Sequence, residues 1–122
     1  MNNIHKITNF KIYSICLELA NIIYQITKNF PKEEIFGITS QLRRATSSIG
    51  ANIAEGYNRH TIKDQSRFYY IAKGSITESI FFLELSNNLG YIETKECENL
   101  IIKFTKLDIK IYNYINYLKR QP

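Results

Sequence analysis

Apolar residues recur at intervals of three and four along four stretches of the chain. This interval places side chains on one face of an α-helix and is typical of helices that pack in a bundle. The stretches cover residues 10–28, 38–58 and 61–89, and the last runs from 94 almost to the C-terminus. No segment alternates apolar and polar residues over the length of a useful strand. The pattern therefore predicts four α-helices and no β-sheet.

The residues between these stretches are typical of helix ends. Pro31 breaks the pattern after the first stretch, and Thr61 with Asp64 three positions later is close to a capping box. Gly90 suits the left-handed conformation that ends many helices, and Thr94 is expected to cap the last helix. Such short connections favour antiparallel neighbours. We therefore predict an all-α fold, an up-down-up-down antiparallel four-helix bundle.

The first predicted helix carries two apolar stripes. One consists of Phe10, Tyr13, Leu17, Ala20, Tyr24 and Thr27, and the other consists of Ile12, Cys16, Leu19, Ile23, Ile26 and Phe30. A four-helix monomer covers one such stripe easily but not both. The second stripe therefore indicates self-association, and we expect the bundle to form a homo-oligomer.

Length and composition fit a single domain spanning residues 1–122. Hydrophobic residues make up 44% of the chain and charged residues 22%, which allows a core that needs no disulfide bonds. Cys16 and Cys97 lie on apolar stripes, so we expect buried thiols. The sequence has no apolar signal core near its start and no apolar run of membrane-spanning length. We therefore expect a cytoplasmic protein without membrane contact.

The second predicted helix carries a polar stripe beside its apolar face. A rotation of about 100° per residue places Arg44, Ser48, Glu55 and Arg59 within a narrow arc, with Asn52 between this stripe and the apolar face. Small residues are frequent on the same helix, at positions 45, 47, 48, 50, 51, 54 and 56. These small residues would let a neighbouring helix approach closely.

A glutamate lies on an apolar line of the third predicted helix. Glu78 is midway between Ile71 and Leu85 in heptad spacing, where a carboxylate requires a cationic or hydrogen-bonding partner. We expect that partner to be Arg43 or Arg44. The resulting structural polar network consists of Arg43, Arg44, Ser48, Asn52, Glu55 and Glu78.

Two interpretations of this polar network are open. In the first, it fixes the register between helices or between subunits. In the second, Arg43, Arg44 and Arg59 contact a ligand or a phosphate group.

Two groups of basic residues are candidate nucleic-acid contacts in a chain of net charge +5. The first shares one face of the last predicted helix and consists of Lys103, Lys106 and Lys110. The second surrounds the turn before the third helix and consists of Arg59, His60, Lys63 and Arg67. Tyr57 and Tyr70 are close enough in sequence to stack on bases. The alternative is that the lysines form a solvated face and the tyrosines pack in the core or an interface.

The sequence gives little support for an enzyme. His5 and His60 are the only histidines, which is too few for the common His-rich metal sites. The HExxH spacing and a glycine-rich phosphate loop are both missing. We therefore expect a non-enzymatic protein with no cofactor and no metal.

Several segments resemble a known bacterial family of four-helix bundles, the proteins encoded in 23S rRNA intervening sequences. The central segments that carry the resemblance are Arg43-Arg44-Ala45, Ser48-Ile49 and Asn52-Ile53-Ala54-Glu55-Gly56-Tyr57. Further matching segments are Phe30-Pro31-Lys32-Glu33-Glu34, Gly37-Ile38-Thr39-Ser40-Gln41, residues 67–75 and Leu89-Gly90-Tyr91. The chain departs from the family at Gly50, where proline or another small residue is frequent; this change does not affect the expected fold.

The resemblance implies a homo-oligomeric ring of five subunits. The family also resembles the accessory protein of diversity-generating retroelements, a basic pentameric barrel that binds nucleic acid and a reverse transcriptase. Five copies of a +5 chain would carry about +25, enough to contact phosphates without reading sequence. We therefore expect binding to structured RNA or duplex DNA. The alternative is a protein-interaction scaffold or accessory subunit that binds a protein partner and no nucleic acid.

Overall fold

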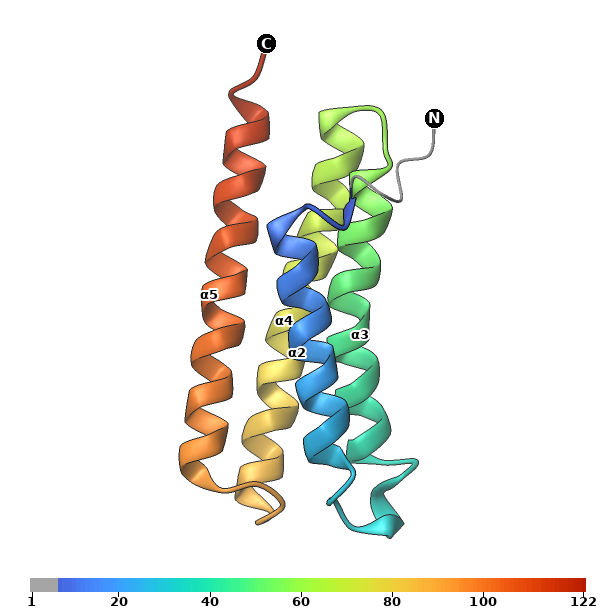
Figure 1. The fold of residues 1–122 in the computed structure, drawn as a ribbon, viewed down its shortest axis with the longest axis vertical. Coiled ribbons are helices and arrows are strands. Elements are labelled where there is room, and N and C mark those ends of the chain that lie inside the picture. Colours follow the sequence, from blue (N-terminus) through green and yellow to red (C-terminus); the bar gives the residue numbers. More distant parts are fainter. Residues whose placement is uncertain (1–6) are drawn as a thin grey trace.

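The computed structural model describes residues 7–122, and within that range the chain forms four long α-helices and no strand. The elements in chain order are α2 (Lys11–Thr27), the short 3-10 helix η1 (Lys32–Glu34), α3 (Ile38–Tyr57), α4 (Ile62–Asn88) and α5 (Thr94–Lys119). Short loops join adjacent helix ends, so successive helices run antiparallel (Figure 1). The predicted four-helix bundle is confirmed.

The ends of α4 follow the predicted chemistry. Thr61 precedes the helix in an extended conformation, and its Oγ1 accepts a hydrogen bond from the amide of Asp64 at 3.1 Å. At the other end Gly90 has φ of 81°, and the amide of Tyr91 bonds to the carbonyl of Ser86 at 2.9 Å. This is the Schellman arrangement, in which a left-handed glycine lets the chain satisfy the last carbonyls of the helix.

The cap predicted at Thr94 is wrong. Glu93 precedes α5, and no side chain caps the first turn of this helix. Thr94 is the first helical residue, and its Oγ1 instead accepts a hydrogen bond from Asn87 Nδ2 at 3.1 Å. The same Asn87 nitrogen donates to the carbonyl of Ile92 at 3.0 Å. Thr94 therefore helps fasten the loop to the end of α4, which is a tertiary contact that local sequence spacing does not reveal.

The closest packing in the bundle lies between α3 and α4, at the small residues of α3. A Cβ on Gly56 would come within 2.6 Å of the Tyr69 ring and 3.0 Å of the Gln65 carbonyl oxygen. A Cβ on Gly50 would come within 3.2 Å of the Cys16 Cβ on α2. Glycine at these two positions therefore allows the backbone of α3 to approach both neighbours.

The two apolar stripes of α2 have different surroundings. Ile12, Cys16, Leu19 and Ile23 are buried in the core, together with Thr27. On the other stripe, Leu17 and Tyr24 remain about half exposed. One chain therefore buries the stripe through Ile12 and Ile23 more fully, and on the other stripe only Thr27 is buried.

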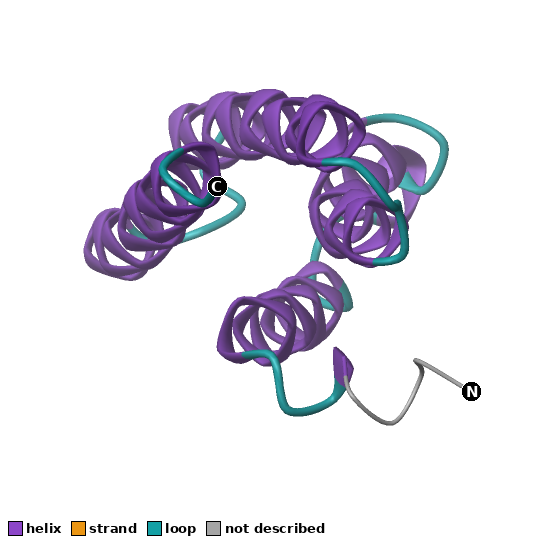
Figure 2. Cartoon of the chain, turned by 90° about the horizontal axis from the view of Figure 1, so that it is seen from above, coloured by secondary structure: helices purple, strands orange, loops and turns teal. Residues whose placement is uncertain are grey.

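The helices follow an open arc when viewed from above, with α2 and α5 at its two ends (Figure 2). α2 contacts α5 much less than it contacts α3. Large side chains still fill the space between them, because Leu19 of α2 and Phe104, Leu107 and Ile111 of α5 are all buried. The core is thus continuous between α2 and α5, and polar side chains line the outer edge of this contact.

Candidate functional site

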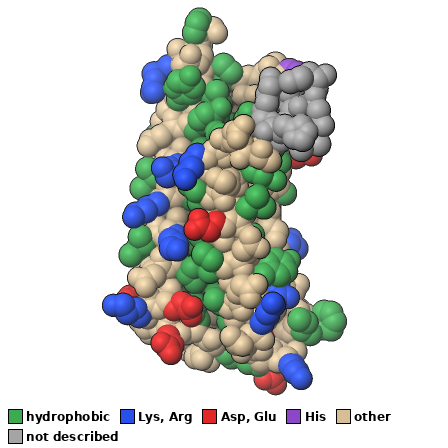
Figure 3. All heavy atoms as spheres, in the orientation of Figure 1, with side chains coloured by type: hydrophobic (Ala, Val, Ile, Leu, Met, Phe, Trp, Pro, Cys, Tyr) green, Lys and Arg blue, Asp and Glu red, His purple; other side chains and the backbone are tan. Residues whose placement is uncertain are grey.

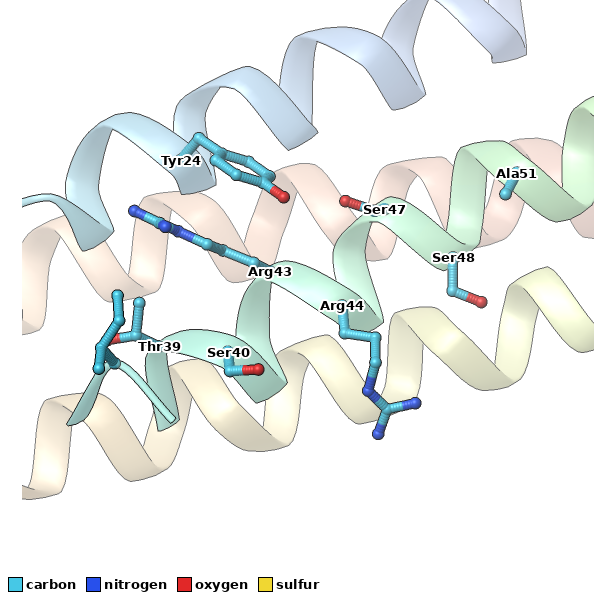
Figure 4. Close-up of a pocket in the computed structure, with 9 residues that line it drawn as sticks. Tyr24, Thr39, Ser40, Arg43, Arg44, Ser47, Ser48 and Ala51 are labelled. Atoms are coloured by element: carbon cyan, nitrogen blue, oxygen red, sulfur yellow. The ribbon is translucent and has the colours of Figure 1, made fainter. Parts of the chain in front are cut away.

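Arg43 and Arg44 are adjacent in sequence but point in different directions. Arg43 Nε donates to Thr27 Oγ1 at 2.8 Å, and its guanidinium lies 4.7 Å from the centroid of the Tyr24 ring. Thr27 Oγ1 in turn donates to the carbonyl of Ile23 at 2.7 Å. Figure 4 shows Arg43 extended beside Tyr24, with Arg44 directed away from both. Arg43 therefore links α3 to α2.

Arg44 lies on the exposed surface, and its Nη2 donates to Gln41 Oε1 at 3.0 Å. Around it is a shallow depression of about 630 Å³ between α3, the end of α2 and the loop that connects them. The depression is lined by Tyr24, Ile35, Thr39, Ser40, Arg43, Arg44, Ser47, Ser48 and Ala51 (Figure 4). Most of these side chains are small, so a partner surface could approach the helix closely here.

Ser48 and Asn52 belong to a chain of polar contacts between α3 and α4. Asn52 Nδ2 donates to the Ser48 carbonyl at 2.8 Å and to Ser48 Oγ at 3.0 Å. Ser75 Oγ of α4 donates to Ser48 Oγ at 3.0 Å, and Ser79 Oγ donates to the Ser75 carbonyl at 2.8 Å. Ser79 Oγ also lies 3.2 Å from Thr46 Oγ1.

Three members of this chain, Thr46, Ser75 and Ser79, were missed by sequence reasoning. They are buried, and Ser75 and Ser79 lie four positions apart on the core side of α4. That spacing was the available signal. Ser48 and Asn52 both make hydrogen bonds to residues of the same chain. These contacts support the interpretation in which the two residues fix the register between helices.

Glu55 and Arg59 pair at the end of α3, with Arg59 Nη2 3.0 Å from Glu55 Oε2. Arg59 also lies 3.8 Å from Asp64 of α4, which binds Arg67 at 3.2 Å. The two guanidinium groups lie 4.7 Å and 4.4 Å from the centroid of the Phe68 ring. The carboxylates therefore offset part of the positive charge at this turn and hold both arginines in place.

The expected pairing of Glu78 with Arg43 or Arg44 is not formed within the chain. Glu78 is exposed, and the two arginines bond to Thr27 and Gln41 instead. The physical reason is the orientation of α4. Its core side is formed by Tyr69, Ala72, Ile76 and Leu83, so the line through Glu78 faces outward.

The remaining residues of the turn are exposed. His60 and Lys63 lie at the surface, close in sequence to Arg59 and Arg67 (together, the basic turn). Tyr57 is partly buried against Phe10, with ring centroids 5.1 Å apart. Tyr70 is exposed, and its hydroxyl accepts a hydrogen bond from Lys119 Nζ at 3.1 Å. Of the two tyrosines, only Tyr70 is exposed, and Lys119 Nζ lies 5.3 Å from the centroid of its ring.

Lys103, Lys106 and Lys110 form an exposed row along α5, here called the lysine row. They line a shallow depression on the α2–α5 side together with Ile15, Glu18, Leu19 and Leu107. A neighbouring depression extends the basic character with Lys11 beside Lys110, whereas the depression that holds Lys95 beside Lys103 is also lined by Glu93 and Glu96. Figure 3 shows basic side chains along α5, with acidic ones nearer its lower end. Sequence reasoning missed Lys11 and Lys95, because Lys11 belongs to a different helix and Lys95 lies two turns before the row.

The described residues offer no group of three or more His, Cys, Asp or Glu side chains that could hold a metal. His5 lies outside the described range. Both cysteines are buried and free, and burial raises the pKa of the Cys16 thiol to about 12. Burial also raises the pKa of the Cys97 thiol. Both thiols are therefore protonated at neutral pH, and a protonated thiol is a weak nucleophile and metal ligand.

Between residues 7 and 122, no helix combines the length and the apolar character that crossing a membrane requires. The fold and the site thus define an all-α bundle with a polar seam between α3 and α4 and basic groups at its surface.

Comparison with known proteins gives the family. The family model for the 23S rRNA-intervening sequence protein matches residues 8–113, and the chain belongs to that family. A crystal structure of a protein of unknown function from the S23 ribosomal protein family of Bacteroides thetaiotaomicron VPI-5482 is similar to this chain, with 26% sequence identity and a TM-score of 0.76. The similarity covers 85% of this chain and 97% of the other. A comparison with curated proteins gives no match.

Proposed function

We propose that the protein forms a homopentameric ring that binds structured RNA or duplex DNA through a basic surface, largely without reading base sequence. It acts as a binding protein in the cytoplasm, with no catalytic activity, cofactor or metal. The observation that carries this proposal is the lysine row of α5. The family name and the name of the similar structure both refer to ribosomal RNA or ribosomal proteins, which makes RNA a reasonable partner class.

The lysine row has a spacing that suits a phosphate backbone. Lys103 and Lys110 are seven residues apart, which is about 10 Å along a helix. Phosphates on one strand of a duplex advance by about 3.4 Å along its axis, so the row spans about three of them. Because the lysines project from a rigid helix, their charges are held together on one face of the molecule.

Assembly is supported by apolar surface on a different part of the chain. Leu17 and Tyr24 of α2 are about half exposed, and Phe36 in the loop before α3 is 93% exposed. Tyr24 lines the depression around Arg44 together with Ile35, the neighbour of Phe36 in sequence, and most of the other lining side chains are small. Exposed apolar residues next to a surface of small residues are typical of an interface between subunits. Five subunits would repeat the lysine row five times.

A protein scaffold is the second candidate, and it is favoured by the apolar residues on the outer faces of α4 and α5. Phe81, Ile102 and Ile109 are each more than half exposed. A protein partner could cover them. Such a scaffold would form the same ring but would not bind nucleic acid.

The test is fluorescence anisotropy of labelled structured RNA and duplex DNA over a salt series. The K103Q/K106Q variant is compared with K28Q/K32Q, which removes the same charge from exposed lysines elsewhere. Each lost phosphate contact lowers the slope of log affinity against log salt by about 0.9 for a duplex, so K103Q/K106Q should lower it by about 2 for each lysine row that the duplex contacts. The control should leave the slope nearly unchanged.

Native mass spectrometry of the same samples measures subunit number independently. Pentamers that bind neither nucleic acid at low salt would support the scaffold. Equal effects of the two double variants would show that net charge, and not the lysine row, determines binding.

A further inference from the structure

A second basic depression lies where the start of α4 meets the end of α5. It has a volume of about 460 Å³ and is lined by Ile62, Lys63, Ser66, Arg67, Tyr70 and Lys119. The two helix ends lie at the same end of the bundle (Figure 1). Lys119 joins them, because its Nζ donates to the Tyr70 hydroxyl at 3.1 Å and lies 5.3 Å from the centroid of that ring. We call this feature the α4–α5 depression.

The lining of the α4–α5 depression is strongly cationic. Lys63, Arg67 and Lys119 contribute three positive charges, and none of the lining residues is acidic. The nearest carboxylate with a defined contact is Asp64, which binds Arg67 at 3.2 Å. The three cations and this carboxylate leave a local charge of about +2. A phosphate monoester, with a charge of about −1.5 to −2 at neutral pH, matches that charge.

The first turn of α4, whose Ile62 and Lys63 line the depression, adds backbone donors. α4 has 27 residues, and Thr61 caps the amide of Asp64. The amides of Ile62 and Lys63, in the first turn, have no acceptor within the helix. Amides of this kind and the positive end of the helix dipole favour an anion.

Ser66 supplies an independent observation. It lines the depression, is only 6% exposed, and its Oγ is buried with no hydrogen-bond partner within the described chain. The other buried serines of α4 all have partners: Ser79 and Ser86 donate to the carbonyls of Ser75 and Phe82 on the preceding turn, and Ser75 donates to Ser48 Oγ of α3. A buried polar group without a partner requires an explanation. A ligand that accepts a hydrogen bond from Ser66 would provide one.

We propose that the α4–α5 depression binds a doubly charged phosphate group. Lys63, Arg67 and Lys119 provide the charge, and the Ser66 hydroxyl rotates about χ1 to donate a hydrogen bond to a phosphate oxygen. The exposed ring of Tyr70 forms an apolar wall against which an attached nucleoside can pack. This proposal deepens the proposed function and rests on it only for the source of the phosphate, which is either the end of a nucleic-acid strand or a free small phosphate.

Titration with inorganic phosphate at constant ionic strength, followed by amide NMR, tests the depression alone. Saturable shifts confined to residues 62–70 and to Lys119 support the proposal. S66A should weaken binding about tenfold, since it removes one hydrogen bond to a charged group. K119Q should weaken it by a similar factor, whereas K28Q, an equal charge change at an exposed lysine outside both basic depressions, should not. Shifts that do not saturate, or equal affinity in all four proteins, would overturn the proposal.

A second experiment distinguishes the sources of the phosphate. One RNA sequence is prepared with a 5′-phosphate and with a 5′-hydroxyl, and both are titrated against wild type and S66A. Tighter binding of the phosphorylated strand, lost in S66A, assigns the depression to strand ends. Equal binding of both strands alongside saturable inorganic phosphate assigns it to a small phosphate.

The two proposals fail separately. Strong, salt-dependent RNA binding without a response to inorganic phosphate would overturn only the proposal that the α4–α5 depression binds phosphate. A phosphate response without binding of either structured RNA or duplex DNA would overturn the proposed function alone.

Discussion

The α3–α4 seam and the α2–α5 side are two helix contacts of the same bundle, yet they are built differently. At the seam, Gly56 brings the backbones together and buried hydroxyls connect the helices. On the α2–α5 side, large apolar side chains meet in the core while lysines and Glu18 line the outer edge.

The difference separates stability from binding. Where two backbones lie this close, there is no space for additional side-chain atoms, because protein interiors are packed as densely as organic crystals. The α2–α5 edge carries exposed charges whose replacement leaves packing intact. We therefore expect substitutions at the seam to change the free energy of unfolding, and substitutions at the edge to change affinity for nucleic acid.

The largest expected effect is at Gly56. Alanine would place its Cβ within 2.6 Å of the buried Tyr69 ring and 3.0 Å of the Gln65 carbonyl oxygen. The ring is fixed by its surroundings, so α3 and α4 must move apart. We expect Gly56→Ala to lower the free energy of unfolding by about 1–3 kcal/mol, measured by urea denaturation.

Gly74→Ala is the matched control, because Gly74 lies on α4 and a Cβ there would meet no heavy atom within 4 Å. Alanine is the better helix former by about 1 kcal/mol, so this variant should be more stable than wild type. If both variants are stabilised to the same extent, the seam is not tightly packed at Gly56.

Sequence patterns predicted the four helices, the Thr61 cap and the Gly90 stop, because these depend on local spacing. They did not predict the hydroxyl contacts of Ser75 and Ser79. A serine within a helix can face either the solvent or the core. Which of the two it faces depends on how the neighbouring helix packs, and local spacing does not show this.

The orientation of α4 was also beyond sequence reasoning. Ile71, Glu78 and Leu85 form an apolar line by spacing, but Ile71 is 44% exposed and a second line, through Tyr69, Ile76 and Leu83, forms the core. A long helix with two such lines does not reveal which one is buried. The predicted partner for Glu78 failed for this reason.

A smaller effect is expected for the hydroxyl pair across the seam. Thr46→Val keeps the shape of the side chain and removes the contact between Thr46 Oγ1 and Ser79 Oγ, 3.2 Å apart. We expect a loss of about 1 kcal/mol in the free energy of unfolding. Combined with Ser79→Ala in a double-mutant cycle, it should give a coupling energy of about 0.5–1.5 kcal/mol.

The ion pair of Lys73 with Asp108, 2.8 Å apart between α4 and α5, provides the comparison for this cycle. Both partners are partly exposed, so their coupling should be smaller, about 0.2–1 kcal/mol. A larger coupling for the ion pair than for the hydroxyl pair would contradict the view that α3–α4 is the more tightly connected contact.

The smallest expected effect is at Glu18 on the α2–α5 edge. Replacing this residue should raise the affinity for nucleic acid, whereas replacing the lysines should lower it. Glu18 lines the same depression as the lysine row, where its carboxylate opposes the approach of phosphate. Two charges about 10 Å apart in water interact by about 0.4 kcal/mol, so Glu18→Gln should raise nucleic-acid affinity about twofold. Unfolding free energy should change by less than about 0.5 kcal/mol, since Glu18 is exposed.

Glu33→Gln is the control for Glu18→Gln, because it makes the same change in net charge at an exposed position on η1, away from α5. Anisotropy titrations at low salt compare the two variants with wild type. A gain for Glu18→Gln alone places the bound phosphates beside the lysine row, because a charge effect that falls off with distance requires the ligand to be near. Equal gains would mean that the ligand responds to the total charge of the assembly. In that case the α2–α5 edge would have no special part in binding, and the separation of stability from binding would hold only for the seam.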